Sequence, residues 1–117
     1  MNWIKIESSE ELKELKENSF NGRVLLFKYS PRCSVNYVIR MLLEREWGEN
    51  EMNMKTYLLD VIAKRDISKQ VEADFGAKHE SPQVLIIENG KAVLEASHGA
   101  ILYSTIRKYC NKPELVK

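Results

Sequence analysis

The sequence predicts an α/β fold in which helices cover both faces of one mixed β-sheet. Strand-like and helix-like runs alternate along most of the chain, and two strand-like runs stand close together near its end. Such alternation is typical of parallel strand–helix–strand units, whereas two strands joined by a short turn are antiparallel. The 117 residues, of which 44% are hydrophobic and 30% charged, are enough for one core, so we expect residues 1–117 to form a single domain.

The chain opens on a short strand and a capped helix. Trp3 to Ile6 is the strand candidate, and Ser8 and Glu11 have the spacing of a capping box, which opens a helix. This helix runs to about Asn18. After it, residues 23–28 have an almost continuous apolar centre, which is typical of a central strand covered on both faces.

The most regular helix follows a break at Ser30-Pro31. Its apolar side chains recur at helical spacing, at Val35, Val38, Ile39, Leu42, Leu43 and Trp47. These residues predict an amphipathic helix from Val35. Cys33 therefore falls at the first turn of this helix.

A third strand and a third helix come next. Residues 54–59 form the strand, which ends at Asp60, and Asp66 can cap the helix. The apolar residues of the helix are four apart, at Ile67, Val71 and Phe75. Gly76 is the expected end of the helix, because glycine readily adopts the left-handed conformation that follows a last helical turn.

A hairpin and a last helix complete the predicted elements. The Asn89-Gly90 pair, between the strand-like runs 84–87 and 91–97, is a strong signal for two antiparallel strands. Residues 101–111 form the last helix. The order β-α-β-α-β-α-β-β-α is the plan of a thioredoxin-like fold, a central mixed β-sheet flanked by helices on both faces. The plan leaves the activity open, since one fold hosts many functions.

This topology brings three loops to one end of the sheet. The Cys33 loop follows the central strand, Pro82 precedes the first hairpin strand, and His98 follows the second, which returns to the same end. We therefore expect Cys33 to lie near Pro82, with His98 within reach. Cys110 lies about ten residues along the last helix, or roughly 15 Å away, so we expect no disulfide between the two cysteines.

Cys33 is the candidate nucleophile. At a helix N-terminus, unpaired N–H groups and the helix dipole favour a thiolate, and Arg32 adds a nearby cation, so we predict a lowered pKa. The alternative is a buried cysteine that packs as a small hydrophobic residue, which is the reading we favour for Cys110. A dithiol motif would place a second cysteine at position 36, which is Asn36, so another thiol must complete any cycle.

Ser81, Pro82 and the two histidines are the other candidates. A cis bond before Pro82 would present the backbone of Ser81 to an extended substrate. His79 and His98 are either loop or packing histidines, or groups that donate a proton to a leaving thiolate or a hydrogen bond to a substrate. Because Cys33 and these histidines lack metal-ligand spacing, we predict no metal site.

Charge and hydropathy exclude several classes of protein. The 18 basic and 17 acidic residues are interspersed, so we expect neither nucleic acid nor a membrane surface as a partner. No apolar stretch approaches the roughly 18 residues that span a bilayer, and the first residues lack a signal-peptide pattern. We therefore expect a cytoplasmic protein, in which both cysteines stay reduced.

Several segments together resemble one known family. They are residues 57–62 (Tyr-Leu-Leu-Asp-Val-Ile), 65–68 (Arg-Asp-Ile-Ser), 75–76 (Phe-Gly), 79–85 (His-Glu-Ser-Pro-Gln-Val-Leu), 89–91 (Asn-Gly-Lys) and 96–98 (Ala-Ser-His). This pattern resembles the monothiol bacilliredoxin family of thioredoxin-like proteins, over about Val24 to Ile106. The most specific parts are the segment around Ser81-Pro82 and the end of the hairpin at His98.

The resemblance implies a thiol–disulfide oxidoreductase that removes bacillithiol, a low-molecular-weight thiol of some bacteria, from protein mixed disulfides. Cys33 would attack the mixed disulfide, the reduced protein would leave, and another thiol would regenerate Cys33. Bacillithiol would be a co-substrate, with no bound cofactor, and Pro82 would belong to the substrate-binding loop. Because bacillithiol carries carboxylates, Arg32 and Lys28 are candidate anion contacts.

The sequence departs from that family beside the reactive cysteine. The family pattern implies a proline directly after this cysteine and a small residue such as serine three positions after it, where this chain has Ser34 and Asn36. A second function therefore stays open: a catalytically weak binding or adaptor module. In such a module the groove beside Ser81-Pro82 would dock an extended peptide, and Cys33 would be incidental.

Overall fold

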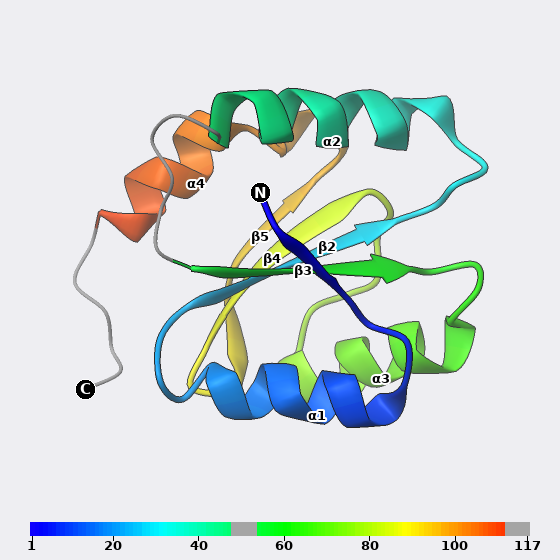
Figure 1. Ribbon diagram of the computed structural model, residues 1–117, viewed down its shortest axis with the longest axis vertical. Helices are drawn as coiled ribbons and strands as arrows, with labels where there is room; N and C mark the ends of the chain where they lie inside the picture. The colour runs from blue at the N-terminus through cyan, green and yellow to red at the C-terminus, as the bar shows by residue number, and fades with distance from the viewer. Residues whose placement is uncertain (48–53, 112–117) are drawn as a thin grey trace.

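The computed structural model describes residues 1–47 and 54–111 (Figure 1). Its elements in chain order are β1 (Trp3–Lys5), α1 (Ser9–Asn18), β2 (Val24–Tyr29), α2 (Ser34–Trp47), β3 (Lys55–Asp60), α3 (Arg65–Phe75), β4 (Gln83–Glu88), β5 (Lys91–Ser97), the 3₁₀ turn η1 (His98–Ala100) and α4 (Tyr103–Cys110). This order confirms the predicted sequence of strands and helices. The turn η1 is an addition that the sequence analysis missed.

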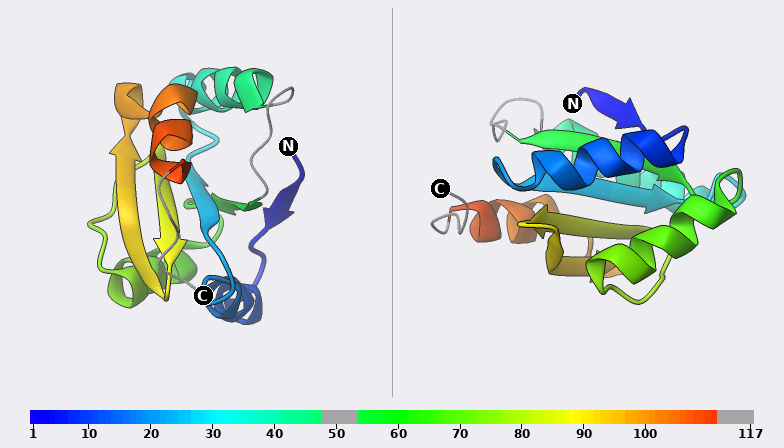
Figure 2. Two further views of the ribbon diagram at one scale, coloured as in Figure 1. Left: turned by 90° about the vertical axis from the view of Figure 1, so that its left-hand side faces the viewer. Right: turned by 90° about the horizontal axis from the view of Figure 1, so that it is seen from below.

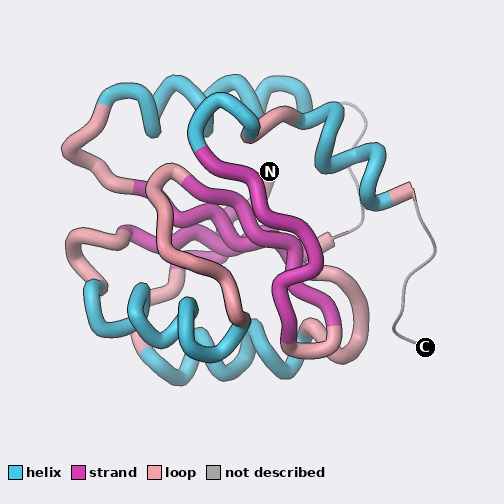
Figure 3. The backbone as a smooth tube through the Cα atoms, turned by 180° about the vertical axis from the view of Figure 1, so that it is seen from behind, coloured by secondary structure: helices cyan, strands magenta, loops and turns pink. Residues whose placement is uncertain are grey.

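Within the described residues, the five strands form one mixed sheet in the order β1-β3-β2-β4-β5. The central strand β2 is parallel to β3 and antiparallel to β4. Strands joined by a helix are usually parallel, but β3 and β4 run in opposite directions. The reason is that the loop after α3 runs back along the sheet before β4 begins (Figure 3). The start of β4 therefore lies beside the end of β2, where Gln83 pairs with Lys28.

Two layers of helices enclose the sheet, as Figures 1 and 2 show. The helices α1 and α3 cover one face, where Leu26, Leu59 and Leu85 are buried. The helices α2 and α4 cover the other face, where Phe27 and Ile86 are buried. Alternate side chains of a strand point to opposite faces of its sheet. The apolar residues of β2 therefore contribute to both layers of the core, as predicted for a central strand.

The helix α2 is present as predicted, but much of its apolar face is not buried. Leu43 and Trp47 are buried, whereas Val35, Val38 and Leu42 are 53%, 46% and 48% exposed. The buried side of the helix also includes Asn36, which is 2% exposed and lies seven residues before Leu43. Periodicity alone therefore overestimates the width of the buried face of this helix.

Two helix starts differ from the prediction. The Glu11 carboxylate accepts a hydrogen bond from the backbone N–H of Glu7 at 2.8 Å, and the Ser8 hydroxyl donates to the same carboxylate, so the reciprocal capping box does not form. Asp66 lies inside α3, and Asp60 instead accepts backbone N–H bonds in the turn before this helix, at 2.9 Å. Neighbouring acidic groups compete for these N–H groups, and spacing alone does not choose between them.

The tight turns follow the prediction more closely. Gly76 ends α3 with a left-handed φ of 72°, and the hairpin turn has a φ of 54° at Asn89 and 75° at Gly90. The last helix begins at Tyr103, two residues later than predicted, because η1 occupies the chain just before it. Leu102 consequently precedes α4 and is 52% exposed.

Candidate active site

Cys33 lies directly before α2, where the side chain of a capping residue normally accepts hydrogen bonds from the N–H groups of the first turn. The thiol is exposed. Hydrogen bonds from the backbone N–H groups of Val35 and Asn36, helped by the Asn36 side chain, hold the pKa of Cys33 below its usual value, although partial desolvation opposes them. The first turn of α2 therefore favours the thiolate, which is the reactive form of cysteine.

The neighbouring Arg32 has a smaller part than the sequence suggests. Its side chain is exposed to solvent. The main causes of the lowered pKa of Cys33 are the hydrogen bonds from α2, and the Arg32 guanidinium is not among them. An exposed charge in water is strongly screened, whereas the N–H groups act at hydrogen-bond distance. The guanidinium of Arg32 is thus not among the main groups that lower the pKa of Cys33.

Asn36 connects the loop that carries Cys33 with the loop that carries Pro82. Its Oδ1 atom accepts a hydrogen bond from the backbone N–H of Ser30 at 2.8 Å and one from the Ser81 hydroxyl at 3.4 Å. The Ser81–Pro82 peptide bond is cis. The structure therefore brings the Cys33 and Pro82 segments together, as the topology predicts. Sequence reasoning noted Asn36 as the residue in the place of a second cysteine but missed its burial.

His98 lies at the same end of the sheet as Pro82. Its backbone N–H donates a hydrogen bond to the Pro82 carbonyl at 3.1 Å, and its Nε2 atom is 3.5 Å from a carboxylate oxygen of Glu80. Its backbone has a left-handed φ of 53°, and its side chain is exposed. His98 therefore belongs to the rim of the site, on the Pro82 side.

His79 is placed differently from the other candidates. Its Nδ1 atom lies 3.3 Å from the Ser68 hydroxyl, and its backbone N–H donates to the Glu72 carboxylate at 3.0 Å, so its contacts are with α3. Burial, and after it the positive charge of Lys28, lowers the pKa of His79. His79 also lines a pocket of about 360 Å³ against α3. This position separates it from α2, which covers the opposite face of the sheet.

Lys28 is fully buried, which argues against the predicted contact between its ammonium and an anionic ligand. Its ammonium donates a hydrogen bond to Oε1 of Gln83, the neighbour across the β2–β4 pair, at 3.0 Å. Burial lowers the pKa of Lys28 to about 8, against the opposing effect of Glu72 and two other carboxylates. The prediction of an anion contact rests on the charge of Lys28 and its place near Cys33 in the chain, and neither shows that β2 is buried on both faces at this residue.

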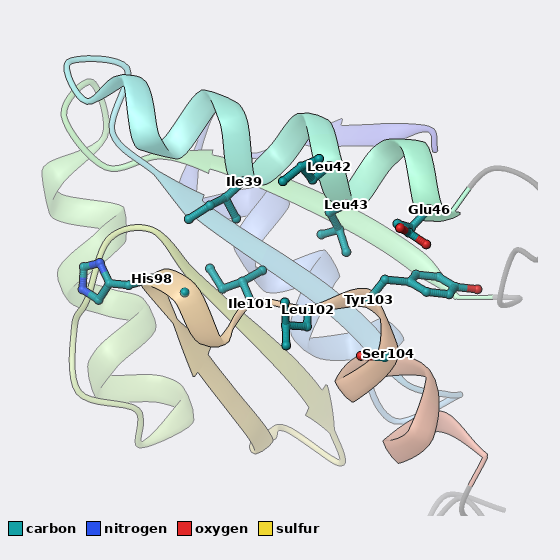
Figure 4. Close-up of a pocket in the computed structure, with 10 residues that line it drawn as sticks. Ile39, Leu42, Leu43, Glu46, His98, Ile101, Leu102, Tyr103 and Ser104 are labelled. Atoms are coloured by element: carbon teal, nitrogen blue, oxygen red, sulfur yellow. The ribbon is translucent and has the colours of Figure 1, made fainter.

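Two hollows adjoin the site. A pocket of about 190 Å³ lies beside the thiol, lined by Tyr29, Ser30, Pro31, Cys33, Ser34, Asn36, Tyr37 and Arg40. The Arg40 guanidinium lies over the Tyr29 ring, 5.3 Å from its centroid, and adds a positive charge that sequence reasoning missed. A second pocket, of about 380 Å³, lies between α2 and the start of α4. Figure 4 shows Ile39 and Leu43 above Ile101, with His98 at one end.

The described part of the chain has neither a cluster of metal ligands nor a membrane-spanning helix. Within residues 1–47 and 54–111, no three His, Cys, Asp or Glu side chains gather in a way that could hold a metal ion. In the same residues, no helix has the length and apolar character that a membrane span requires. The chemistry that this arrangement supports is attack by an exposed thiolate on a disulfide presented beside the Ser81–Pro82 segment.

Comparison with known proteins agrees with this chemistry. Residues 4–106 match the family model of the monothiol bacilliredoxin BrxC. A solved structure described as a putative oxidoreductase with a thioredoxin fold is 28% identical, covers 90% of each chain and has a TM-score of 0.77. Thioredoxins from Schistosoma mansoni (15% identity, 94% of each chain) and Nicotiana alata (14% identity, 95% of this chain and 91% of that one) both have a TM-score of 0.72.

These comparisons confirm two predictions from the sequence. The solved structures are described as thioredoxins or as having a thioredoxin fold, and they match at least 90% of this chain, so the fold is thioredoxin-like. The family model extends over nearly the whole chain, including the Cys33 loop, the Ser81–Pro82 segment and the hairpin. The chain therefore belongs to the monothiol bacilliredoxin BrxC family of thiol–disulfide oxidoreductases.

Proposed function

We propose that the protein removes bacillithiol from protein mixed disulfides through Cys33. One observation carries this proposal: the exposed thiol of Cys33 precedes α2 and accepts hydrogen bonds from its first N–H groups, which lower its pKa. The family match supports a small thiol as the second substrate. The two cysteines, both in the thiol form, suit a reducing compartment, and we infer that the protein acts in the cytoplasm.

The reaction has two exchange steps. The Cys33 thiolate attacks the bacillithiol sulfur of the mixed disulfide, the sulfur–sulfur bond breaks, and the substrate protein leaves as a thiolate that takes up a proton. Cys33 is then joined to bacillithiol. A second thiolate attacks the bacillithiol sulfur of this adduct and releases Cys33 as the thiolate. Each step exchanges one disulfide for another, so no other oxidant or reductant is needed.

The surroundings of Cys33 suit an anionic small thiol. Arg32 is exposed next to the thiol, and Arg40 lines the adjoining pocket. We propose that these guanidinium groups pair with the carboxylates of bacillithiol, a geometry that guanidinium favours. Arg40 also lies 3.7 Å from Glu44, so binding would compete with that ion pair. On the other side of Cys33, the Ser81–Pro82 segment and His98 would receive the polypeptide of the substrate.

The test is an exchange assay on one carrier protein loaded with different small thiols. The protein should release bacillithiol faster than it releases glutathione, whose carboxylates are placed differently, and the Cys33→Ser variant should release neither. The Cys110→Ser variant is the matched control and should keep the wild-type rate. A wild-type protein that releases no small thiol would contradict the proposal. If that protein still bound an extended peptide, the adaptor function would replace it.

A further inference from the structure

Asn36 combines deep burial with an unsatisfied side chain. It is 2% exposed, and its Oδ1 atom accepts hydrogen bonds from Ser30 and Ser81. Its Nδ2 atom is also buried and, among the described residues, has no hydrogen-bond partner. Buried amide N–H groups are nearly always paired, because an unpaired one has lost its hydrogen bonds to water without gaining a partner in the protein. The orphaned donor therefore needs an explanation.

The neighbour that can satisfy this donor is the sulfur of Cys33. Asn36 is the third residue of α2, and the side chain directly before a helix faces its second and third residues. The Asn36 side chain is in fact one of the groups that lower the pKa of Cys33. A thiol is a weak acceptor, whereas a thiolate accepts strongly, so the donor gains its full partner only when Cys33 is charged.

We propose that Asn36 couples the charge on Cys33 to the position of the Ser81–Pro82 segment. Its Oδ1 atom holds Ser30 and Ser81, while its Nδ2 atom donates to the Cys33 sulfur whenever that sulfur is a thiolate. The inference rests on the proposed function and deepens it. In a dithiol enzyme the same position would supply the resolving thiol, but here it stabilises the thiolate that attacks and, in the second exchange step, the thiolate that leaves.

Substitutions can separate the acceptor role of Oδ1 from the donor role of Nδ2. Asn36→Asp keeps an oxygen in the place of Oδ1 for Ser30 and Ser81 but replaces the donor with a negative charge beside the sulfur. Asn36→Ala removes both tasks. Asn21→Asp, the same change at an exposed position that precedes β2 and so lies at the far end of that strand, is the matched control.

The readout is the pKa of Cys33, measured by the pH dependence of its alkylation with iodoacetamide in protein shown to be folded by circular dichroism. We expect Asn36→Asp to raise this pKa by about one unit or more, because a like charge disfavours a second anion. Asn36→Ala should raise it less. Each unit of increase in this pKa should slow alkylation at neutral pH roughly threefold. The reason is that a tenfold loss of thiolate is partly offset by the greater nucleophilicity of the more basic thiolate.

The second readout is the release of Cys33 from its preformed bacillithiol adduct by added thiol, which should slow in both Asn36 variants and stay unchanged in Asn21→Asp. A wild-type pKa and wild-type release rate in folded Asn36→Ala and Asn36→Asp would overturn the role of Asn36. That result would leave the proposed function intact as long as wild-type protein exchanges. A wild-type protein without exchange, by contrast, would contradict the proposed function itself.

Discussion

The two cysteines of this chain lie at opposite ends of helices on the same face of the sheet. Cys33 precedes the first turn of α2, is exposed, and accepts hydrogen bonds from backbone N–H groups. Cys110 is the last residue of α4, is half-buried, and packs against the apolar cluster under α2 and α4. A helix favours an anion at its N-terminus and disfavours one at its C-terminus. The comparison teaches that position on a helix, rather than residue type, decides which of these two thiols we propose as the nucleophile.

The largest expected difference between the two thiols is their rate of alkylation. At pH 7 the lowered pKa of Cys33 gives more thiolate, and we expect it to react on the order of ten times faster than Cys110. The Cys33 rate should rise with pH to a midpoint below about 8.5, the ordinary value for a thiol. Peptide mass spectrometry after a timed reaction measures both sites in one sample. Equal alkylation rates at the two cysteines of the folded protein would contradict the claim that the helix N-terminus activates Cys33.

A smaller difference is expected in the free energy of unfolding, and here substitution of Cys110 should have the larger effect. Cys110→Ser should lower the free energy of unfolding by about 1 kcal/mol, because it places a hydroxyl in an apolar cluster. Cys33→Ser should change it by no more than about 0.5 kcal/mol, since Cys33 is exposed and serine is favoured before a helix. Urea denaturation of the two variants measures both values. A larger loss for Cys33→Ser would show that Cys33 has a structural role instead.

The smallest expected effect concerns Arg32. Because the lowered pKa of Cys33 comes mainly from N–H groups of α2, Arg32→Ala should leave this pKa nearly unchanged. The same variant should bind a bacillithiol disulfide more weakly, through the loss of one exposed guanidinium. The two effects can be measured as the midpoint and the concentration dependence of the reaction of Cys33. A marked rise in the pKa of Cys33 would instead make Arg32 the activating group.

The parts of the fold that local chemistry determines could be predicted from the sequence. Gly76 ends its helix because a left-handed φ favours glycine, and Asn89-Gly90 forms the hairpin turn for the same reason. The position of Cys33 before α2 follows from the break at Ser30-Pro31 and the helical spacing after it. For these residues, a few neighbours in the chain carry most of the information.

The features that depend on distant packing could not be predicted. Lys28 is buried because strands and helices from elsewhere in the chain enclose β2, and periodicity does not show that a lysine will point inward. The contact between Asn36 and Ser81 joins residues 45 positions apart. His79 has the same residue type as His98, yet it is bound to α3, whereas His98 borders Pro82. Topology indicated which loops meet, but not which side chains fill the space between them.

The most direct test of the account is the intact mass of the protein after incubation with bacillithiol disulfide, with glutathione disulfide in a parallel sample. The account predicts a single small-thiol adduct that forms faster with bacillithiol, maps to Cys33 after digestion, and disappears in the Cys33→Ser variant. An adduct that persists in Cys33→Ser, or a folded wild-type protein that takes up neither thiol, would contradict the claim that Cys33 is the exchange nucleophile.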